Sequence, residues 1–308
     1  MLKSVFMGTP PFVIPSLTSL YNHSNLSLII TGTDKHTGRG RKTIIEPEPK
    51  KFAIEHNIPL LQIERINTGD ILKILKEINP DIILLVAFGF IIPEPIFNLP
   101  TYGTINIHAS LLPKYRGASP IHQAILNRDK ITGVTFQRIN KILDSGAILY
   151  QRNIEILSDD DYLSLNEKLS KLSGEATVDF LDKLEKKLLS PIEQDEKSVS
   201  YCRKITKEES FFNWDDDKEV ILSKIKAFIH WPIASVKTKF GILKVYKANA
   251  GTETTEKYGT VVSADKNGFS VSCKNGTIFL TEIQPENSKV MDYKSFLNGH
   301  RIKKGDVL

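Results

Sequence analysis

The sequence predicts a two-domain α/β protein: a Rossmann-like domain on a mostly parallel sheet, followed by a small C-terminal OB-like β-barrel domain. In the first half of the chain, short apolar segments alternate with amphipathic ones, as they do where helices connect parallel strands. A long amphipathic segment and a polar stretch follow, and beyond them short strands are separated by tight-turn signals. We therefore expect the first domain at 1–189, a linker at 190–206 and the second domain at 207–308.

Seven short segments of the first half are apolar enough to form the strands of the predicted sheet. The most apolar, Asp81–Phe88, is typical of a central strand that is buried on both faces. The last two in chain order, Val134–Ile139 and Ile148–Ile154, look like antiparallel edge strands. The other expected strands are Ser4–Met7, Leu28–Thr31, Ile58–Leu61 and Thr104–His108.

Helices are expected between these strands, where apolar residues recur at helical spacing. The shorter ones are Phe12–Tyr21, Pro49–His56, Ile71–Glu77 and Ile121–Asn127. A longer helix ends near Ser190-Pro191. Its apolar positions repeat at spacings near 3.6 residues, at Leu165, Leu169, Leu172, Ala176, Leu184 and Leu188.

The second half has one expected helix, Val220–Phe228, which is stopped by Trp231-Pro232. Two of its connections contain Asn-Gly, at 267–268 and 275–276, and this dipeptide supplies the positive φ angles of tight hairpins. About five short strands joined in this way favour a small barrel. They are Ser235–Lys239, Ile242–Ala248, Gly259–Ala264, Phe269–Cys273 and Thr277–Ile283.

The amino-acid composition gives little information about binding partners or the cellular compartment. Lys and Arg number 41 against 36 Asp and Glu, and this excess permits a polyanionic partner without requiring one. Two cysteines, Cys202 and Cys273, favour neither a disulfide framework nor a zinc site and fit a reducing compartment. The longest apolar run, Ile82–Phe88, is far below the ~18 residues of a membrane span, and the first apolar run is too short for a signal peptide. We expect a soluble cytoplasmic protein.

Two common nucleotide-binding motifs are missing from the places where they would be found. The first strand–helix junction, Met7–Phe12, does not match G-x-G-x-x-G, which disfavours a dinucleotide site despite the Rossmann-like order. The glycines at Gly38 and Gly40 do not form a P-loop.

A dense polar segment, Asn106–Gly117, begins at the end of a predicted strand. Asn106 and His108 are two residues apart, so strand alternation places both side chains on one face. They lie at the carboxyl end of the strand, where open α/β sheets bind ligands. An amide beside an imidazole suits acyl transfer, because the amide donates to a developing oxyanion and the imidazole exchanges a proton. Taken alone, the pair is more simply a loop asparagine and a partly buried histidine with local hydrogen bonds.

Asp144 lies between two predicted strands, in the segment Leu143–Ile148. Aspartate followed by Ser145-Gly146 is ordinary turn chemistry. Alternatively, Asp144 orients His108, as carboxylates orient imidazoles in many active sites. The spacing does not decide between these two interpretations.

The most specific pattern is Asn-x-His-x-Ser-Leu-Leu-Pro at 106–113, followed by Tyr-Arg-Gly at 115–117 and Leu-Asp-Ser-Gly at 143–146. With these segments the chain resembles the folate-dependent formyltransferases, and among them the methionyl-tRNA formyltransferases, nearly end to end. Further matching segments are Met7–Pro10, Thr33–Lys35, Gly38–Lys42, Ala87–Pro93, Gly117–Ile121, Thr132–Val134, Tyr201–Ile205, Trp214-Asp215 and His230–Ala234.

The resemblance implies an enzyme in which the α-amine of initiator methionyl-tRNA attacks the formyl group of 10-formyltetrahydrofolate through an oxyanion intermediate. We expect a monomer as the default, and no metal linking His108, His122 and Asp144, because acyl transfer with a carboxylate-oriented histidine explains these residues without one. The resemblance places the catalytic roles on Asn106, His108 and Asp144. Two departures affect only local loop shape: Ser145-Gly146-Ala147 replaces the usual Thr-Gly-Asp, and Tyr115 stands where Trp or Phe is common. The implied folate contacts are Phe88, Gly89, Ile91, Ser110, Leu111, Leu112 and Pro113.

A basic segment, Lys35–Lys51, is by composition a solvated surface loop. If it contacts phosphates, it should bind RNA backbone with a steep salt dependence. The resemblance implies contact with the tRNA acceptor arm here, and we expect it from Lys35, Arg39, Arg41 and Lys42. Two other functions stay open: formyl transfer to a small substrate such as glycinamide ribonucleotide or an amino-sugar nucleotide, and RNA binding by an inactive formyltransferase scaffold.

Overall fold

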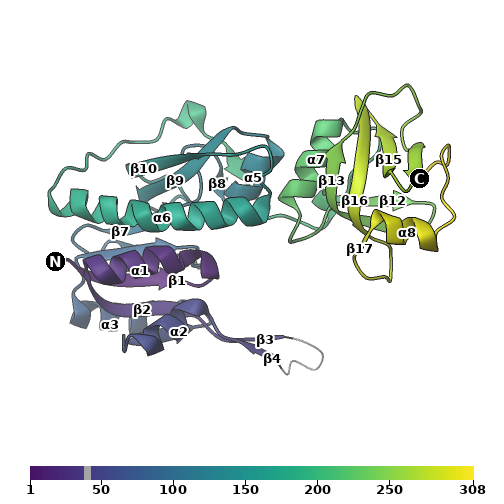
Figure 1. Ribbon diagram of the computed structural model, residues 1–308. Coiled ribbons are helices and arrows are strands. Elements are labelled where there is room, and N and C mark those ends of the chain that lie inside the picture. The colour runs from purple at the N-terminus through teal and green to yellow at the C-terminus, as the bar shows by residue number, and fades with distance from the viewer. Residues whose placement is uncertain (38–42) are drawn as a thin grey trace. The chain divides into compact units, whose positions relative to one another are not determined.

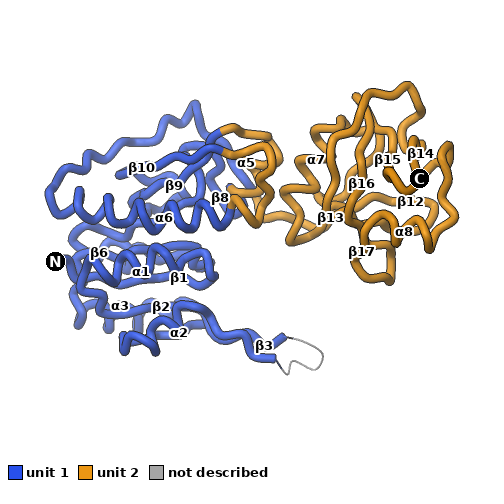
Figure 2. The backbone as a smooth tube through the Cα atoms, in the orientation of Figure 1, with its two compact units in different colours: residues 1–120, 131–155, 166–202 blue, residues 121–130, 156–165, 203–308 orange. Residues whose placement is uncertain are grey.

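The computed structural model describes residues 1–37 and 43–308, which form two compact units (Figure 2). Unit 1 comprises residues 1–120, 131–155 and 166–202, and unit 2 comprises residues 121–130, 156–165 and 203–308. Each unit is therefore assembled from segments that are separated in the sequence. The predicted domains, 1–189 and 207–308, are instead each one continuous stretch of sequence. These boundaries remain a prediction.

Unit 1 is built on a seven-stranded sheet with the order β10-β9-β7-β6-β1-β2-β5. Five neighbouring strands, from β7 to β5, are parallel, whereas β9 is antiparallel to both β7 and β10. The predicted mostly parallel sheet is confirmed, although only β10 of the two antiparallel strands lies at an edge. The strands are β1 (Lys3–Gly8), β2 (Asn25–Gly32), β5 (Leu60–Ile63), β6 (Ile82–Val86), β7 (Thr104–His108), β9 (Ile131–Arg138) and β10 (Ile148–Glu155).

The core of unit 1 lies on both faces of this sheet. Val5 and Met7 of β1 share one hydrophobic cluster with Ile71 and Leu75 of α3, whereas Phe6 between them is buried on the opposite face. Helices α1 and α6 lie side by side (Figure 1). The helices are η1 (Pro11–Val13), α1 (Ile14–His23), α2 (Glu48–Glu55), α3 (Thr68–Ile78), α4 (Glu94–Phe97), α5 (Pro120–Leu126) and α6 (Tyr162–Glu185). Of the helices within the described residues, none is long and apolar enough to cross a membrane.

The central strand β6 and the long helix α6 both end earlier than the apolar pattern predicts. All five residues of β6 are buried, as expected, but the strand ends at Val86 because Ala87 has a φ of 43°. Helix α6 ends at Glu185, and Lys187 has a φ of 56°, so Leu188 lies outside the helix with 64% of its surface exposed. A left-handed φ is incompatible with both a strand and an α-helix.

Unit 2 contains an antiparallel sheet with the order β12-β13-β16-β15-β14, and the short β17 pairs with β16. It encloses a second hydrophobic core, which includes Ile221 and Ile225 of α7 and Phe296 of α8. Together the two units confirm the predicted fold class. The elements are α7 (Lys218–Ala227), β12 (Ser235–Thr238), β13 (Gly241–Ala250), β14 (Val261–Asp265), β15 (Gly268–Cys273), β16 (Gly276–Gln284), β17 (Met291–Asp292) and α8 (Tyr293–Gly299). Asn275 and Gly276 have the predicted positive φ angles, but Asn267 and Gly268 are not among the described residues that do.

Several short elements carry too little periodicity to be predicted. The basic segment forms the arms of a hairpin, β3 (Lys35–Thr37) and β4 (Thr43–Ile45), where the sequence indicates a loop. Two-residue strands β8 (Arg116–Gly117) and β11 (Tyr201–Cys202) pair in parallel, and 3₁₀ turns lie at Glu196–Ser198 and Glu208–Ser210. The β8–β11 pair is the element that positions the candidate site.

Candidate active site

Asn106, His108 and Asp144 converge in unit 1 at the carboxyl end of β7. Asn106 and His108 lie on one face of this strand, and Asp144 belongs to the turn between β9 and β10. The Asn106 Nδ2 donates to Asp144 Oδ1 over 3.4 Å, and His108 Nδ1 lies 3.6 Å from Asp144 Oδ2. The structure therefore brings together three side chains that were predicted from two separate parts of the sequence.

The Asp144 carboxylate is buried, with 8% of the side chain exposed, and both of its oxygens are engaged. Oδ1 also accepts a hydrogen bond from Gln137 Nε2 at 2.8 Å, and Oδ2 accepts one from the Gly117 backbone N–H at 2.8 Å. These donors replace the water that a buried carboxylate loses. Gln137 was not predicted as a site residue, although it pairs with Asn106 in the register between β7 and β9.

The His108 ring is held from the side opposite Asp144. Its Nε2 lies 2.8 Å from the Tyr115 carbonyl oxygen, which can only accept, so Nε2 carries a proton. The ring nitrogen that can gain or lose a proton is therefore Nδ1, which faces Asp144. Because His108 is only 6% exposed, this arrangement fixes both the tautomer and the orientation of the ring.

The loop after β7 is held by hydrogen bonds from neighbouring strands and from the chain beyond α6. Thr135 Oγ1 donates to the Ser110 carbonyl at 2.6 Å and accepts from the Leu112 N–H at 3.0 Å. Gly117 has a φ of 121°, and a Cβ at this position would lie 2.1 Å from the Cys202 carbonyl oxygen. Only glycine fits here, and this close approach allows the Gly117 N–H to reach Asp144.

Residues 190–202, which we call the return segment, run back along this loop. The expected linker begins here, yet the segment is part of unit 1. β11 pairs with β8, and Tyr115 N–H donates to Ser200 Oγ at 2.9 Å. The buried guanidinium of Arg116 donates to Gln194 Oε1 at 2.9 Å and to Glu196 at 2.8 Å. The polar composition of the return segment therefore reflects contacts to the site.

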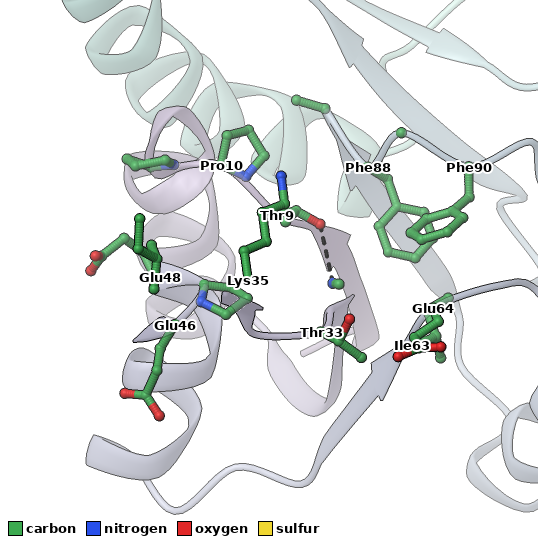
Figure 3. Close-up of a pocket in the computed structure, with 16 residues that line it drawn as sticks. Thr9, Pro10, Thr33, Lys35, Glu46, Glu48, Ile63, Glu64, Phe88 and Phe90 are labelled. Carbon is green, nitrogen blue, oxygen red and sulfur yellow. Dashed lines mark hydrogen bonds between the residues drawn. The ribbon is translucent and has the colours of Figure 1, made fainter. Parts of the chain in front are cut away.

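A cavity of about 570 Å³ lies at the same end of the sheet, beyond β1, β2, β5 and β6 (Figure 3). Phe88 and Phe90, whose ring centroids are 5.0 Å apart, lie on one side together with Glu64. Glu46 and Glu48 lie on the other side, and Lys35 lies between them. This is where the chain order of the parallel sheet reverses, between β1 and β6, and where such sheets bind ligands. An apolar wall with a few charged groups suits an organic ligand that carries polar groups.

The predicted folate contacts are divided between two places. Phe88 and Gly89 line the cavity, whereas Ser110–Pro113 form the loop next to His108 and are not among the described residues that line it. Ile91 has 89% of its surface exposed. All of them lie on loops that follow the neighbouring strands β6 and β7.

Of the predicted tRNA contacts, Lys35 begins β3 and lines the cavity, while Arg39, Arg41 and Lys42 lie outside the described residues. Lys50 of α2 forms ion pairs with residues at both ends of the hairpin. Its Nζ lies 2.6 Å from Asp34 before β3 and 2.6 Å from Glu46 after β4. Hydrogen bonds from Lys50 and Gln62 lower the pKa of Asp34 below its usual value.

His122 lies in unit 2, stacked on Tyr162 with ring centroids 4.1 Å apart. Burial, together with the nearby His230, lowers its pKa to about 4. Within the described residues, no group of three or more His, Cys, Asp or Glu side chains is arranged to hold a metal ion.

The pKa of His122 predicts an acid-sensitive stability. The unfolded chain binds a proton near pH 6.5 and the folded chain only near pH 4, so stability falls as the pH is lowered through this window. We expect a loss of about 3 kcal/mol by pH 4 from this group. Urea unfolding of wild type and His122→Gln at pH 7, 5.5 and 4 should show the smaller decline in the variant. Parallel declines would contradict the assignment.

The chain is similar to known proteins over its whole length. The formyl transferase family matches residues 2–181, and the C-terminal domain of formyl transferases matches residues 204–301. The methionyl-tRNA formyltransferase of Dictyoglomus thermophilum is 39% identical over 99% of both chains. That of Geobacter metallireducens is 36% identical over 99% of this chain and 97% of its own.

Solved structures share the fold at low sequence identity. The methionyl-tRNA formyltransferase of Clostridium thermocellum is 18% identical, covers 90% of this chain and all of its own, and has a TM-score of 0.54. An N-formyltransferase of Helicobacter canadensis, in complex with folinic acid and dTDP-3-aminofucose, is 20% identical over 91% of this chain and 99% of its own, with a TM-score of 0.70. HypX from Aquifex aeolicus in complex with tetrahydrofolic acid is 17% identical and covers 96% of this chain and 47% of its own, with a TM-score of 0.63.

Proposed function

The chain belongs to the methionyl-tRNA formyltransferase family, and we propose that it transfers the formyl group of 10-formyltetrahydrofolate directly to the α-amino group of initiator methionyl-tRNA. The observation that carries the catalytic part is the convergence of Asn106, His108 and Asp144 at one end of the sheet. We also propose that the enzyme acts as a monomer in the cytoplasm, which sedimentation and cell fractionation can test.

The proposed reaction begins when the neutral α-amine attacks the formyl carbon. A new C–N bond forms, and the carbonyl oxygen becomes negatively charged in the tetrahedral intermediate. We assign stabilisation of this oxyanion to the Asn106 amide, because its nitrogen carries two hydrogens and, among the described residues, it donates only the long 3.4 Å hydrogen bond to Asp144. The bond from the formyl carbon to N10 of the folate then breaks.

One proton must leave the attacking amine, and one must reach N10 of the folate. His108 Nδ1 is the group that exchanges this proton, since Nε2 is already committed to the Tyr115 carbonyl. The Asp144 carboxylate, 3.6 Å away, stabilises the imidazolium while it exists. A contact of this length in the free enzyme is compatible with catalysis, because such hydrogen bonds often tighten when substrates bind.

For the donor, we propose that the folate lies against Phe88, Gly89 and Ile91 on one side and Ser110–Pro113 on the other. In support, these residues belong to neighbouring loops after β6 and β7, and one related structure contains tetrahydrofolic acid and another folinic acid. A pterin ring would find apolar and aromatic surface mainly at Phe90, which packs against the buried Phe88 and lines the cavity with it.

For the acceptor, we propose that the β3–β4 hairpin presents Lys35, Arg39, Arg41 and Lys42 to the tRNA phosphates. Lys50 should then matter for tRNA binding, because its ion pairs at both ends of the hairpin hold the hairpin in place. We expect Lys50→Met to raise the KM for methionyl-tRNA about fivefold, equivalent to about 1 kcal/mol, without changing kcat or the KM for the folate. Lys76→Met, on the exposed face of α3, is the matched control. An unchanged KM in Lys50→Met would remove this anchoring role.

The experiment that tests the function compares charged initiator methionyl-tRNA with free amines as formyl acceptors, in wild type and in Arg41→Ala and Lys42→Ala. Rapid transfer to methionyl-tRNA and a loss of affinity in the variants are expected, and the loss should shrink as salt is raised. Transfer to an amino-sugar nucleotide in preference to tRNA would instead favour the small-substrate alternative. Binding of tRNA without any transfer would favour the inactive scaffold.

A further inference from the structure

Gln194 is outside the three side chains assigned to catalysis, yet it contacts the turn that carries one of them. Its Nε2 donates to the backbone carbonyls of Asp144 at 2.9 Å and Gly146 at 2.8 Å. The side chain is buried, with 8% of its surface exposed. An amide nitrogen has two hydrogens to donate, and its two short contacts are both to this turn; a longer contact of 3.5 Å reaches Gln137 Oε1.

The other end of the Gln194 amide is tied to the second loop that holds Asp144. Its Oε1 accepts from Arg116 Nε at 2.9 Å. Arg116 directly precedes Gly117, whose backbone N–H donates to the Asp144 carboxylate. Gln194 therefore connects the turn that carries Asp144 with the loop that donates to its side chain.

The turn at Asp144 has a backbone conformation that the surroundings must maintain. Asp144 has a φ of 53°, in the left-handed region that residues with a Cβ seldom adopt. On the exposed side of the turn, the Ser145 hydroxyl is within hydrogen-bond distance of Asn140 Oδ1 and of the Ile142 carbonyl oxygen. On the buried side, the Gln194 side chain donates one hydrogen bond to the backbone carbonyl of residue 144 and one to that of residue 146.

We propose that Gln194 is a positioning residue for the formyl transfer reaction. Through its two donated hydrogen bonds it fixes the backbone of residues 144–146, and so sets the distances from the Asp144 carboxylate to His108 and Asn106. This inference rests on the proposed function, because it assigns Gln194 to the step that Asp144 serves. A displacement of about 1 Å at reacting groups is enough to lower a rate about 10²-fold.

The most selective variant is Gln194→Glu. It keeps the size of the side chain and an oxygen that accepts from Arg116, but it turns an oxygen instead of an amide towards the two carbonyls. We expect kcat to fall about 10–100-fold while the KM values for both substrates change less than about twofold. Glu193→Gln, the exposed neighbour, is the matched control and should behave as wild type.

A double-mutant cycle with Asp144→Asn separates positioning from a general structural effect. If Gln194 acts through Asp144, then Gln194→Glu lowers kcat on the wild-type background but less than about threefold on the Asp144→Asn background. An equal loss on both backgrounds, or a normal kcat in Gln194→Glu alone, overturns the inference. A normal kcat in Asp144→Asn overturns the proposed role of Asp144 as well, so the two failures are distinguishable.

Circular dichroism shows whether Gln194→Glu is folded. If it is unfolded, Gln194→Met, which is similar in size, replaces it in the cycle.

Discussion

Replacing Asn106 by alanine is expected to lower kcat for formyl transfer about 10²–10³-fold, because one donor to the oxyanion is lost. The amide stabilises charge that exists only after the amine has attacked, so the KM values should change little. The fold should also tolerate the change, since the Asn106 side chain donates only the long hydrogen bond to Asp144 among those described. Steady-state formylation of charged initiator tRNA at saturating folate measures the loss.

Asn98→Ala provides the control for this variant, because Asn98 is an exposed residue at the end of α4 in the same unit. It should retain wild-type kcat. A kcat for Asn106→Ala within tenfold of wild type would mean that the oxyanion has another donor, and the role of Asn106 would have to be abandoned.

The shared position of Asn106 and His108 could be predicted from the sequence because it depends only on strand alternation. Asp144 could not be assigned in the same way, because its approach depends on how β9 pairs with β7. Gln137 shows the same limit: it becomes a partner of Asp144 once the antiparallel register places it opposite Asn106. The sequence contains no local signal for that register, and the family resemblance joined Asp144 to the other two.

The return segment is polar and has no helical or strand periodicity, which is why the sequence predicts that a linker begins at residue 190. Its structure comes from contacts to other elements: the two-residue pairing of β11 with β8, the hydrogen bond from Tyr115 to Ser200, and the amide of Gln194. Such single contacts leave no periodic pattern, so the sequence does not reveal them.

The fold itself was predicted in type and order but not in its exact limits. Apolar runs locate the buried strands, because burial on both faces requires them. The ends of β6 and α6 instead depend on left-handed backbone at Ala87 and Lys187, and neither residue type indicates that conformation. The β3–β4 hairpin was missed because its arms are short and exposed, so no apolar alternation marks them.

Replacing Asp144 by asparagine is expected to have the larger effect on catalysis, about 10³–10⁴-fold in kcat, because the imidazolium loses its carboxylate although the Tyr115 carbonyl still fixes the ring tautomer. The carboxylate accepts from Gln137, Asn106 and Gly117 and faces His108. Asparagine has one acceptor oxygen, so its NH₂ group must face a donor, and at least one buried donor is left without an acceptor. The lost hydrogen bond should also lower the free energy of unfolding by about 1–3 kcal/mol.

Asp144→Glu distinguishes the charge from its exact position. It keeps the carboxylate but lengthens the side chain, so the charge near His108 is retained while the hydrogen bonds to Gly117 and Gln137 are displaced. If the charge is the main contribution, Asp144→Glu should retain much more activity than Asp144→Asn; if position dominates, both should be comparably impaired. Measurement of kcat and urea unfolding for the two variants separates these contributions. A kcat for Asp144→Asn within tenfold of wild type would show that Asp144 only shapes the turn, which is the interpretation that the sequence alone leaves open.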